Sequence, residues 1–227
     1  MRDALLLEYF RGLPQLPDGD FFAQRSVELH VHLERFRKQV KARYNEGTLL
    51  RVLHGGKTEL RRAAVVALGL MGTMAANAGV ARHLHDEDLQ IRRLAADALW
   101  NIWFRAEGES NRRELQRLSQ LPDLSKSLQG LSFLLDRCPG FAEAYNQRAI
   151  VYFRLGKYQP SAADCRRALE RNPFHFGAQA GLAQCLLKMK RPRAALRALR
   201  QALKINPELE GVAQTIRDLE ESLGDGK

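Results

Sequence analysis

The spacing of apolar residues predicts helices along most of the chain. Small apolar residues recur at intervals of three and four in RRAAVVALGLMG (61–72) and RRLAADALWNIW (92–103), which is the period of an α-helix. A further apolar stripe of the same period predicts a helix near the C-terminal end of the chain. The members of that stripe are Val212, Ile216, Leu219 and Leu223.

The N-terminal residues 1–46 carry a mixed pattern. Apolar and polar residues alternate from Val27 to Leu33, which is typical of a β-strand. The overlapping stretch LERFRKQVKARY has helical spacing, however, and the sequence offers no partner strand. We therefore predict an N-terminal helical segment with a long helix through this stretch. On such a helix His30 and His32 point to different faces, so they do not indicate a metal site.

The two segments at 61–72 and 92–103 are related to each other by a constant shift, which carries position 61 onto position 92. This shift superimposes two similar helices, and TMAANAGVARHL between them predicts a further helix. We assign residues 47–106 to one repeat array on this basis. The residue pairs that carry the shift are Arg61 and Arg92, Ala64 and Ala95, Ala67 and Ala98, and Leu68 and Leu99.

This array resembles HEAT repeats of the short bacterial kind, which also occur in phycobilisome-lyase proteins. In that pattern a D-x-D-x-x-[VI]-R turn opens the second helix, and Asp86, Asp88, Ile91 and Arg92 match it. The resemblance implies that Asp86 pairs with arginines along the stack. Gly55 stands where the first repeat would have its aspartate, so the ladder of ion pairs should begin at the second repeat.

The cluster HLHDED at 83–88 has two interpretations, a helix start and a metal site. An aspartate just before a helix accepts backbone N–H bonds, and its charge suits the helix dipole. His83 and His85 are two positions apart, so on a helix they point to different faces. We therefore predict that Asp86 or Asp88 caps the next helix, and we assign no metal ligand in the chain.

A second repeat has a different and clearer period. Asn172-Pro173 and Asn206-Pro207 are 34 apart, and a further step back reaches Pro139. Residues 142–173 resemble the tetratricopeptide (TPR) repeat, which has this period. The matching positions are Tyr145, Ala149, Tyr152, Gly156, Tyr158, Ala168 and Pro173. The following unit, 176–207, keeps the pattern but has Lys190 where the first unit has the turn glycine.

These repeats predict an all-α protein, an α-solenoid of antiparallel helix pairs in which a HEAT-like array precedes a TPR array. We place a bridging segment with a short helix at 107–124 and the TPR repeats with a C-terminal capping helix at 125–227. Residues 125–139 fit the second helix of a preceding, degenerate unit. Trp100, Trp103 and Phe104 are expected to close the HEAT-like stack against residues 106–124, with an exposed docking patch as the alternative.

Charge adds a second feature to this picture. The 227 residues include 36 Lys and Arg against 26 Asp and Glu, a formal net charge of +10. Seven of the cations lie between Lys188 and Lys204, where no acid occurs. Such a surface attracts acidic partners, whether protein or nucleic acid. No apolar run approaches the roughly 18 residues of a membrane span, and we expect a cytoplasmic protein without membrane partners.

Candidate chemistry is sparse. The sequence has no G-x-x-x-x-G-K-[ST] or G-x-G-x-x-G phosphate loop, no H-E-x-x-H and no G-x-S-x-G. Cys138, Cys165 and Cys185 form no C-x-x-C pair and are interpreted as small buried apolar residues. His175, in a turn between repeats, is interpreted as structural. We therefore predict no catalytic residue, no cofactor and a non-enzymatic scaffold or adaptor, with a basic nucleic-acid-binding solenoid or a HEAT-fold lyase as alternatives.

The TPR groove is the predicted site of partner binding, because the first helix of each pair lines the inner face of such an array. The pattern resembles co-chaperone TPRs that clamp a terminal carboxylate, but the lysine and asparagine positions of that clamp hold Asn146 and Ile150 here. We therefore expect a peptide or helix with an acidic element. The candidate groove residues are Asn146, Ile150, Phe153, Arg154, Gln184, Leu187 and Lys188.

Overall fold

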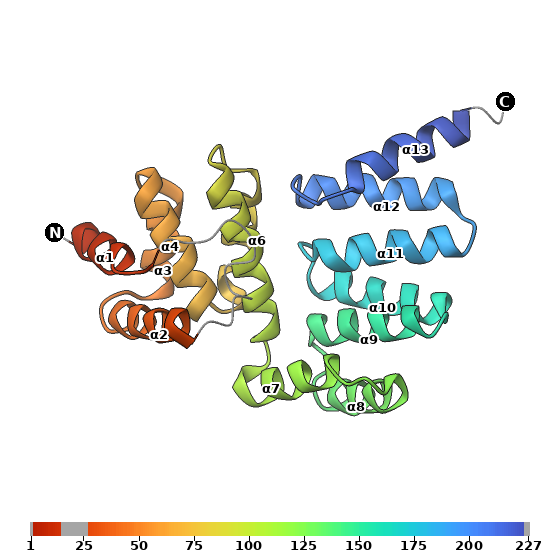
Figure 1. Cartoon of the computed structure of the whole chain (residues 1–227), viewed down its shortest axis with the longest axis horizontal. Coiled ribbons are helices and arrows are strands. Elements are labelled where there is room, and N and C mark those ends of the chain that lie inside the picture. The colour runs from red at the N-terminus through yellow and green to blue at the C-terminus, as the bar shows by residue number, and fades with distance from the viewer. Residues whose placement is uncertain (1, 15–26, 225–227) are drawn as a thin grey trace. The chain divides into compact units, whose positions relative to one another are not determined.

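A computed structural model of the chain describes residues 2–14 and 27–224 (Figure 1). Every regular element in these two ranges is helical, and neither range contains a strand. The predicted all-α solenoid class is confirmed. The chain divides into two compact units, Met1–Trp103 and Phe104–Lys227, and each is described by itself.

Unit 1 holds the N-terminal helices and the predicted HEAT-like segment. Its elements are α1 (Arg2–Arg11), α2 (Val27–Lys41), α3 (Glu46–Gly55), α4 (Thr58–Met71), η1 (Met74–Ala76), α5 (Asn77–Ala81), η2 (Arg82–His85) and α6 (Leu89–Phe104), whose last residue belongs to unit 2. The two similar helices predicted by the shift of position 61 onto position 92 are α4 and α6. The helix predicted between them is broken into two 3₁₀ turns and one short α-helix.

The strand-like alternation in the N-terminal segment belongs to a helix, as predicted. α2 spans Val27–Lys41 and packs against α4, with Leu29, Leu33, Phe36 and Val40 buried. The spacing of these four residues places them on one helix face, and burial of that face favours a helix over a strand. Phe10 of α1 meets Phe36 edge to face, with ring centroids 6.4 Å apart. Residues 15–26 of the predicted segment lie outside the described residues.

Unit 2 repeats one helix pair with a constant period. Its helices are α7 (Gly108–Ser119), α8 (Leu124–Arg137), α9 (Ala142–Arg154), α10 (Tyr158–Arg171), α11 (Phe176–Lys188), α12 (Pro192–Ile205) and α13 (Val212–Gly224). α8, α10 and α12 begin at residues 124, 158 and 192, and α7, α9 and α11 begin at 108, 142 and 176. Both series advance by the predicted TPR period, so the pairs are α7–α8, α9–α10 and α11–α12.

The predicted helix of the bridging segment 107–124 is therefore the first helix of the first pair. Leu115 and Leu118 of α7 are buried in one core with Leu131 and Leu134 of α8. Gly130 permits this close approach, since a Cβ atom there would lie 2.2 Å from a methyl group of Leu118. α8 is the predicted second helix of a degenerate unit.

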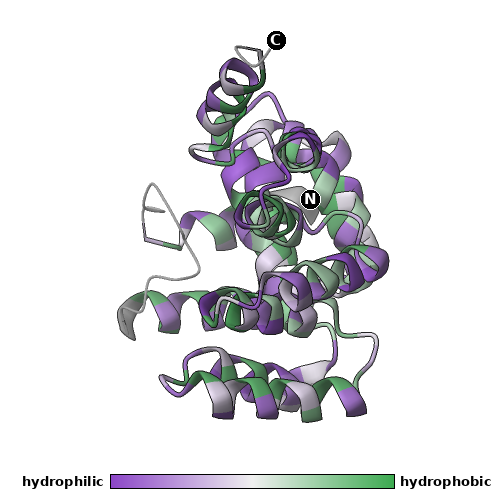
Figure 2. Ribbon diagram, turned by 90° about the vertical axis from the view of Figure 1, so that its right-hand side faces the viewer, coloured by the Kyte–Doolittle hydropathy of each residue, from purple (hydrophilic) through white to green (hydrophobic). Residues whose placement is uncertain are grey.

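The core of unit 2 lies between the helices of each pair and between neighbouring pairs. Hydrophobic and hydrophilic residues alternate along the ribbons in Figure 2, as expected of helices that bury one face. α13 packs its predicted apolar stripe against α12, with Val212, Ile216 and Leu219 on the core of Ala195 and Leu199. In the part of the chain that the structure describes, no helix has both the length and the apolar character needed to cross a bilayer.

Candidate functional site

The predicted groove residues lie on α9 and α11, the first helices of two successive pairs, which contact each other directly. Ile150, Phe153 and Arg154 of α9 have Gln184, Leu187 and Lys188 of α11 at the equivalent positions of the next repeat. The shared period places these six residues in three rows of two across neighbouring helices. We call them the groove residues below.

The groove residues combine exposed apolar surface with exposed charge. Ile150 is one of the few large apolar side chains left accessible, with 45% of its surface exposed. Arg154, Gln184 and Lys188 are exposed, and Phe153 and Leu187 are half-buried. The Phe153 ring rests edge-on against Tyr158 of α10, with centroids 5.3 Å apart. The result is an apolar floor with cations at one edge.

Asn146 does not belong to this accessible set, which corrects the expectation from sequence. It is only 3% exposed, and its amide nitrogen donates to Glu143 Oε1 at 3.2 Å. Gln147 donates to the same oxygen at 2.7 Å. Asn146 faces inward because a buried carboxylate must be surrounded by donors.

The second oxygen of Glu143 meets His175, the histidine predicted to be structural. Both side chains are fully buried, and His175 Nε2 lies 2.8 Å from Glu143 Oε2. His175 Nδ1 accepts the backbone N–H of Ala178, so Nε2 carries the hydrogen and donates it to the carboxylate. His175 thereby caps α11 and ties it to α9, and its structural interpretation is confirmed.

A second buried polar contact lies on the opposite side of α9. Arg148 donates through Nε and Nη2 to the two oxygens of Asp164 on α10, at 2.7 and 3.0 Å. Its third nitrogen donates to Ser132 on α8 at 3.2 Å. Burial opposes the charge of Arg148, but the bond to Asp164 outweighs it and raises the pKa of the guanidinium. One side chain thus connects three helices of unit 2.

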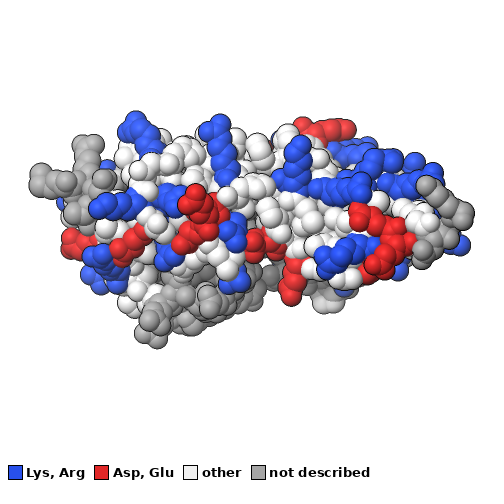
Figure 3. Space-filling model, turned by 90° about the horizontal axis from the view of Figure 1, so that it is seen from above, with Lys and Arg blue, Asp and Glu red and all other residues white. Residues whose placement is uncertain are grey.

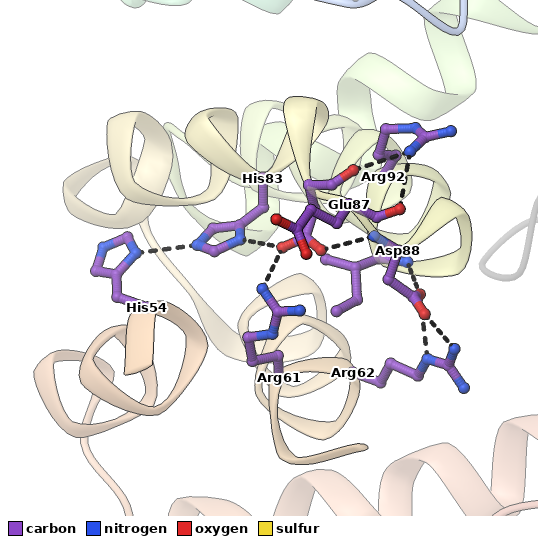
Figure 4. Close-up of polar contacts among 9 residues, drawn as sticks. His54, Arg61, Arg62, His83, Glu87, Asp88 and Arg92 are labelled. Atoms are coloured by element: carbon purple, nitrogen blue, oxygen red, sulfur yellow. Dashed lines mark hydrogen bonds and ion pairs between the residues drawn. The ribbon is translucent and has the colours of Figure 1, made fainter. Parts of the chain in front are cut away.

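The HLHDED cluster of unit 1 is a helix start with ion pairs (Figure 4). Asp88 Oδ1 accepts the backbone N–H of Ile91 at 2.9 Å, which confirms the predicted cap of α6. Arg61 of α4 donates to Asp86 Oδ2 at 2.8 Å, which confirms the predicted pairing of Asp86 with an arginine of the stack. Burial opposes the charge of Asp88, but its ion pair with Arg62 and the N–H of Ile91 outweigh burial and lower the pKa of that carboxyl.

Two histidines extend this network toward α3. His83 Nδ1 lies 2.9 Å from Asp86 Oδ2, and because a carboxylate only accepts, Nδ1 carries the hydrogen. His83 Nε2 is then the acceptor for His54 Nδ1 at 3.0 Å (Figure 4). Burial and the positive charge of nearby Arg82 lower the pKa of His54. Nothing in the sequence pattern indicated this contact, which joins residues 29 positions apart.

His83 is buried and His85 is exposed, so the two histidines of the cluster diverge as predicted. Within residues 2–14 and 27–224, no group of three or more His, Cys, Asp or Glu side chains is arranged to hold a metal ion. The hydrogen bonds and ion pairs of this network join α3, α4 and the segment before α6.

Of the two tryptophans near the end of α6, Trp103 is a core residue and Trp100 is half-buried beside it. Trp103 is buried, and its indole nitrogen donates to Asn77 Oδ1 at 2.8 Å. Trp100 packs edge to face on Trp103, with centroids 5.1 Å apart. Phe104 packs in the core of unit 2, on the cluster that contains Leu115.

The cysteines have the environment expected of small apolar residues. Cys165 and Cys185 are buried and Cys138 is half-buried, and all three are free thiols. Burial, together with the nearby charge of Glu107, raises the pKa of Cys138. A hydrogen bond that the Cys165 thiol donates to Cys185, together with burial, raises the pKa of Cys165. Both effects favour the neutral thiol, which is a poor nucleophile.

Comparison with known proteins identifies the repeats of unit 2. Residues 142–175 and 177–209 each match the tetratricopeptide repeat family, so the chain contains two TPR repeats. A TPR repeat-containing protein of Rhizobium etli is 33% identical over 85 residues. That stretch is 37% of this chain and 42% of the relative, so the chain spans less than half the length of the relative that it matches.

Several solved TPR structures resemble the chain at low sequence identity. The first TPR domain of Spaghetti (RPAP3), bound to an HSP90 peptide, covers 51% of this chain and 91% of its own, at 16% identity and a TM-score of 0.48. The TPR2B domain of yeast Sti1 in complex with an Hsp70 peptide covers 50% of this chain and 95% of its own, at 21% identity and a TM-score of 0.45. A TPR protein of Thermus thermophilus covers 85% of this chain and 90% of its own, at 20% identity and a TM-score of 0.41.

Proposed function

We propose that unit 2 is a protein-interaction module that binds a peptide or helix across α9 and α11, and that the chain acts as a non-enzymatic scaffold. The observation that carries the proposal is the exposed apolar side chain of Ile150 beside half-buried Phe153 and Leu187 on the first helices of two TPR repeats. An apolar anchor point surrounded by polar residues is typical of peptide recognition.

The charge beside this floor supports an acidic partner. The C-terminal ends of α9 and α11 and the turns that follow them contain no acid. They carry five exposed cations, Arg154, Lys157, Lys188, Lys190 and Arg191. Complementary charge steers a partner and fixes its orientation more than it adds affinity. The proposed ligand therefore has an apolar side chain for the floor and carboxylates that reach the turns.

Unit 1 completes the proposal as a HEAT-like array over residues 47–106. The Arg61–Asp86 ion pair supports this assignment, because the resemblance implied it. In this proposal unit 1 supports the interaction module and carries no chemistry of its own.

Selection from a peptide library displayed on phage, followed by fluorescence anisotropy on the selected peptides, tests the groove. The informative variant is Ile150→Gln, since the next repeat already has Gln184 at this position. We expect the variant to weaken binding roughly tenfold, as for a moderate interface anchor. Arg154→Glu should weaken acidic peptides further and reduce the salt dependence of their binding.

The matched control is Phe133→Gln on α8. Phe133 is the second exposed large apolar side chain of unit 2, with 59% of its surface accessible, and it lies outside the groove residues. The control should bind the selected peptides like the parent. Equal losses for Phe133→Gln and Ile150→Gln, or selected peptides without acidic residues, would contradict the proposed site.

A further inference from the structure

The surface of α12 carries a row of cations that the groove proposal does not use. Arg193, Arg197, Arg200 and Lys204 are all exposed. Steps of four, three and four residues bring them to one face of the helix, within a sector of about 60°. We call these four residues the basic stripe. Lys and Arg side chains gather toward the right-hand end of Figure 3, the end at which Figure 1 shows α12 and α13.

The turn before the stripe holds a lysine at a position where the backbone conformation favours glycine. Lys190 has a φ of 55°, in the left-handed region, and it is the one residue other than glycine with a positive φ among those described. The equivalent position of the preceding repeat is Gly156, with a φ of 72°. Both turns make the same backbone bonds, such as Lys190 N to Leu187 O and Gly156 N to Phe153 O, both 2.9 Å.

This turn is one that glycine adopts without steric strain and lysine does not. A non-glycine residue held in such a conformation is a reason to look for a function of its side chain. Lys190 adds its charge between exposed Lys188 and Arg191, directly before the stripe. The strained turn and the stripe together form one continuous cationic segment from residue 188 to residue 204.

We propose that the basic stripe of α12, extended by Lys190 of the turn before it, binds the phosphate backbone of a nucleic acid. The stripe lies outside the groove residues, and Lys190 is used in both proposals. The row spans about 16 Å, the rise of eleven residues of α-helix. It thus runs past roughly five phosphates of one strand of a duplex, at about 3.4 Å per phosphate along the axis. Three of the four stripe residues are arginines, whose planar guanidinium matches phosphate oxygens.

The rest of the α12 surface favours this partner over a membrane or a specific base sequence. No large apolar side chain of α12 is exposed, since Leu199 is buried and Leu196, Leu203 and Ile205 are half-buried. The helix therefore has little apolar surface to insert into lipid, and it has no aromatic side chain on which to stack a base. Binding should be electrostatic and independent of sequence, with contacts to phosphates alone.

One carboxylate modulates the stripe. Glu220 of α13 accepts from Arg200 Nη2 at 2.6 Å, with both side chains about half exposed. In water an exposed pair of this kind is weak, so phosphate can replace the carboxylate. Glu220 therefore competes with the proposed ligand for Arg200, and removing its charge should tighten binding.

Fluorescence anisotropy of the full chain tests the proposal, with a labelled DNA duplex of about 20 base pairs, which is two helical turns, and a single-stranded RNA of equal length. For five phosphate contacts, four from the stripe and one from Lys190, we expect the logarithm of the duplex affinity to fall with the logarithm of salt concentration with a slope between roughly −4 and −5. Arg193→Gln with Arg197→Gln should lower the magnitude of this slope by about 2 and the affinity by more than about tenfold at roughly 0.1 M salt.

Arg166→Gln with Arg217→Gln is the matched control, because both arginines are exposed, one on α10 and one on α13, and the loss of charge is the same. Its slope should fall clearly less than that of the stripe variant. Lys190→Gly should reduce the slope by about 1 while retaining the fold, and Glu220→Gln should increase the affinity. These two variants keep the test valid even if the double variant does not fold.

Three results would overturn the proposal. The first is an equal change of slope for the stripe variant and its control, which would mean that net charge alone is responsible. The second is binding to vesicles that contain phosphatidylserine with no binding to either oligonucleotide. The third is a loss of oligonucleotide binding in Ile150→Gln, which would place the nucleic acid in the groove. Retention of peptide binding by the stripe variant separates this proposal from the groove proposal.

Discussion

The two TPR repeats of unit 2 have the same arrangement of helices and differ in the side chains that pack between them. In the repeat α9–α10, the buried pair Arg148–Asp164 spans the two helices. In α11–α12 the equivalent positions hold Leu182 and Ala198, and both pack in an apolar core. The comparison shows that a TPR helix pair needs two side chains that pack against each other at these positions, and that these side chains need not be charged.

Breaking the ion pair from one side should have the largest effect on stability. Asp164→Ala leaves the largely buried guanidinium of Arg148 without its carboxylate, and removing one partner of such a pair costs roughly 3–5 kcal/mol. Arg148→Leu with Asp164→Ala installs the residues of the second repeat and should recover most of that loss. Chemical denaturation of the parent and the three variants, analysed as a double-mutant cycle, measures the coupling. Additive losses would show that the two repeats are not interchangeable at this position.

The His175–Glu143 contact offers a second, smaller contrast. The second repeat has Leu209 and Gly177 at these positions, so it has neither group. His175→Leu removes one donor from a fully buried carboxylate, and we expect a loss of about 2 kcal/mol, typical of a hydrogen bond to a charged group. His175→Leu with Glu143→Gln leaves no unpaired charge and should be more stable than His175→Leu alone. A denaturation midpoint for the double variant below that of the single variant would contradict this account.

The sequence predicted the regular part of this architecture, and the reason is periodicity. The TPR period located α8 to α12, because the small residues and prolines that carry it are those that the helix packing requires. The same period extended back to residue 108 locates α7. We predicted a bridging segment with a short helix there and not a TPR helix, since α7 lacks the aromatic and alanine positions of the pattern.

The contacts between distant residues could not be predicted from the sequence. Asn146 stands at a groove position, but whether it faces solvent depends on Glu143 and His175, the latter from the next repeat. The bond between His54 and His83 depends on how α3 meets η2, and no local pattern encodes that. The cap at Asp88 was predictable because it lies three positions from the N–H that it accepts.

The two turns at Gly156 and Lys190 give a third contrast, in which the expected change in the free energy of unfolding is about 1 kcal/mol. Gly156→Ala places a Cβ atom on a left-handed residue and should destabilise the chain by roughly 1 kcal/mol. Lys190→Gly removes the same penalty from the second turn, so its thermal midpoint should equal or exceed that of the parent. Differential scanning calorimetry measures both. A clear loss of stability in Lys190→Gly would mean that the lysine side chain, and not the backbone, holds this turn.

Lowering the pH should destabilise the contact at His54 and leave α12 unaffected, and this is the smallest of the four expected effects. Because the folded state lowers the pKa of His54, the unfolded chain binds a proton more readily. Stability from this contact is complete above the unfolded pKa of about 6.5 and is lost as pH falls below it. Hydrogen exchange, corrected for intrinsic rates, should show amides of α3 less protected at about pH 5.5 than at about pH 7.5, on either side of that pKa. The difference should shrink in His54→Gln, while amides of α12, which contains no histidine, change in neither protein. An unchanged pH response of α3 in His54→Gln would assign it to another group.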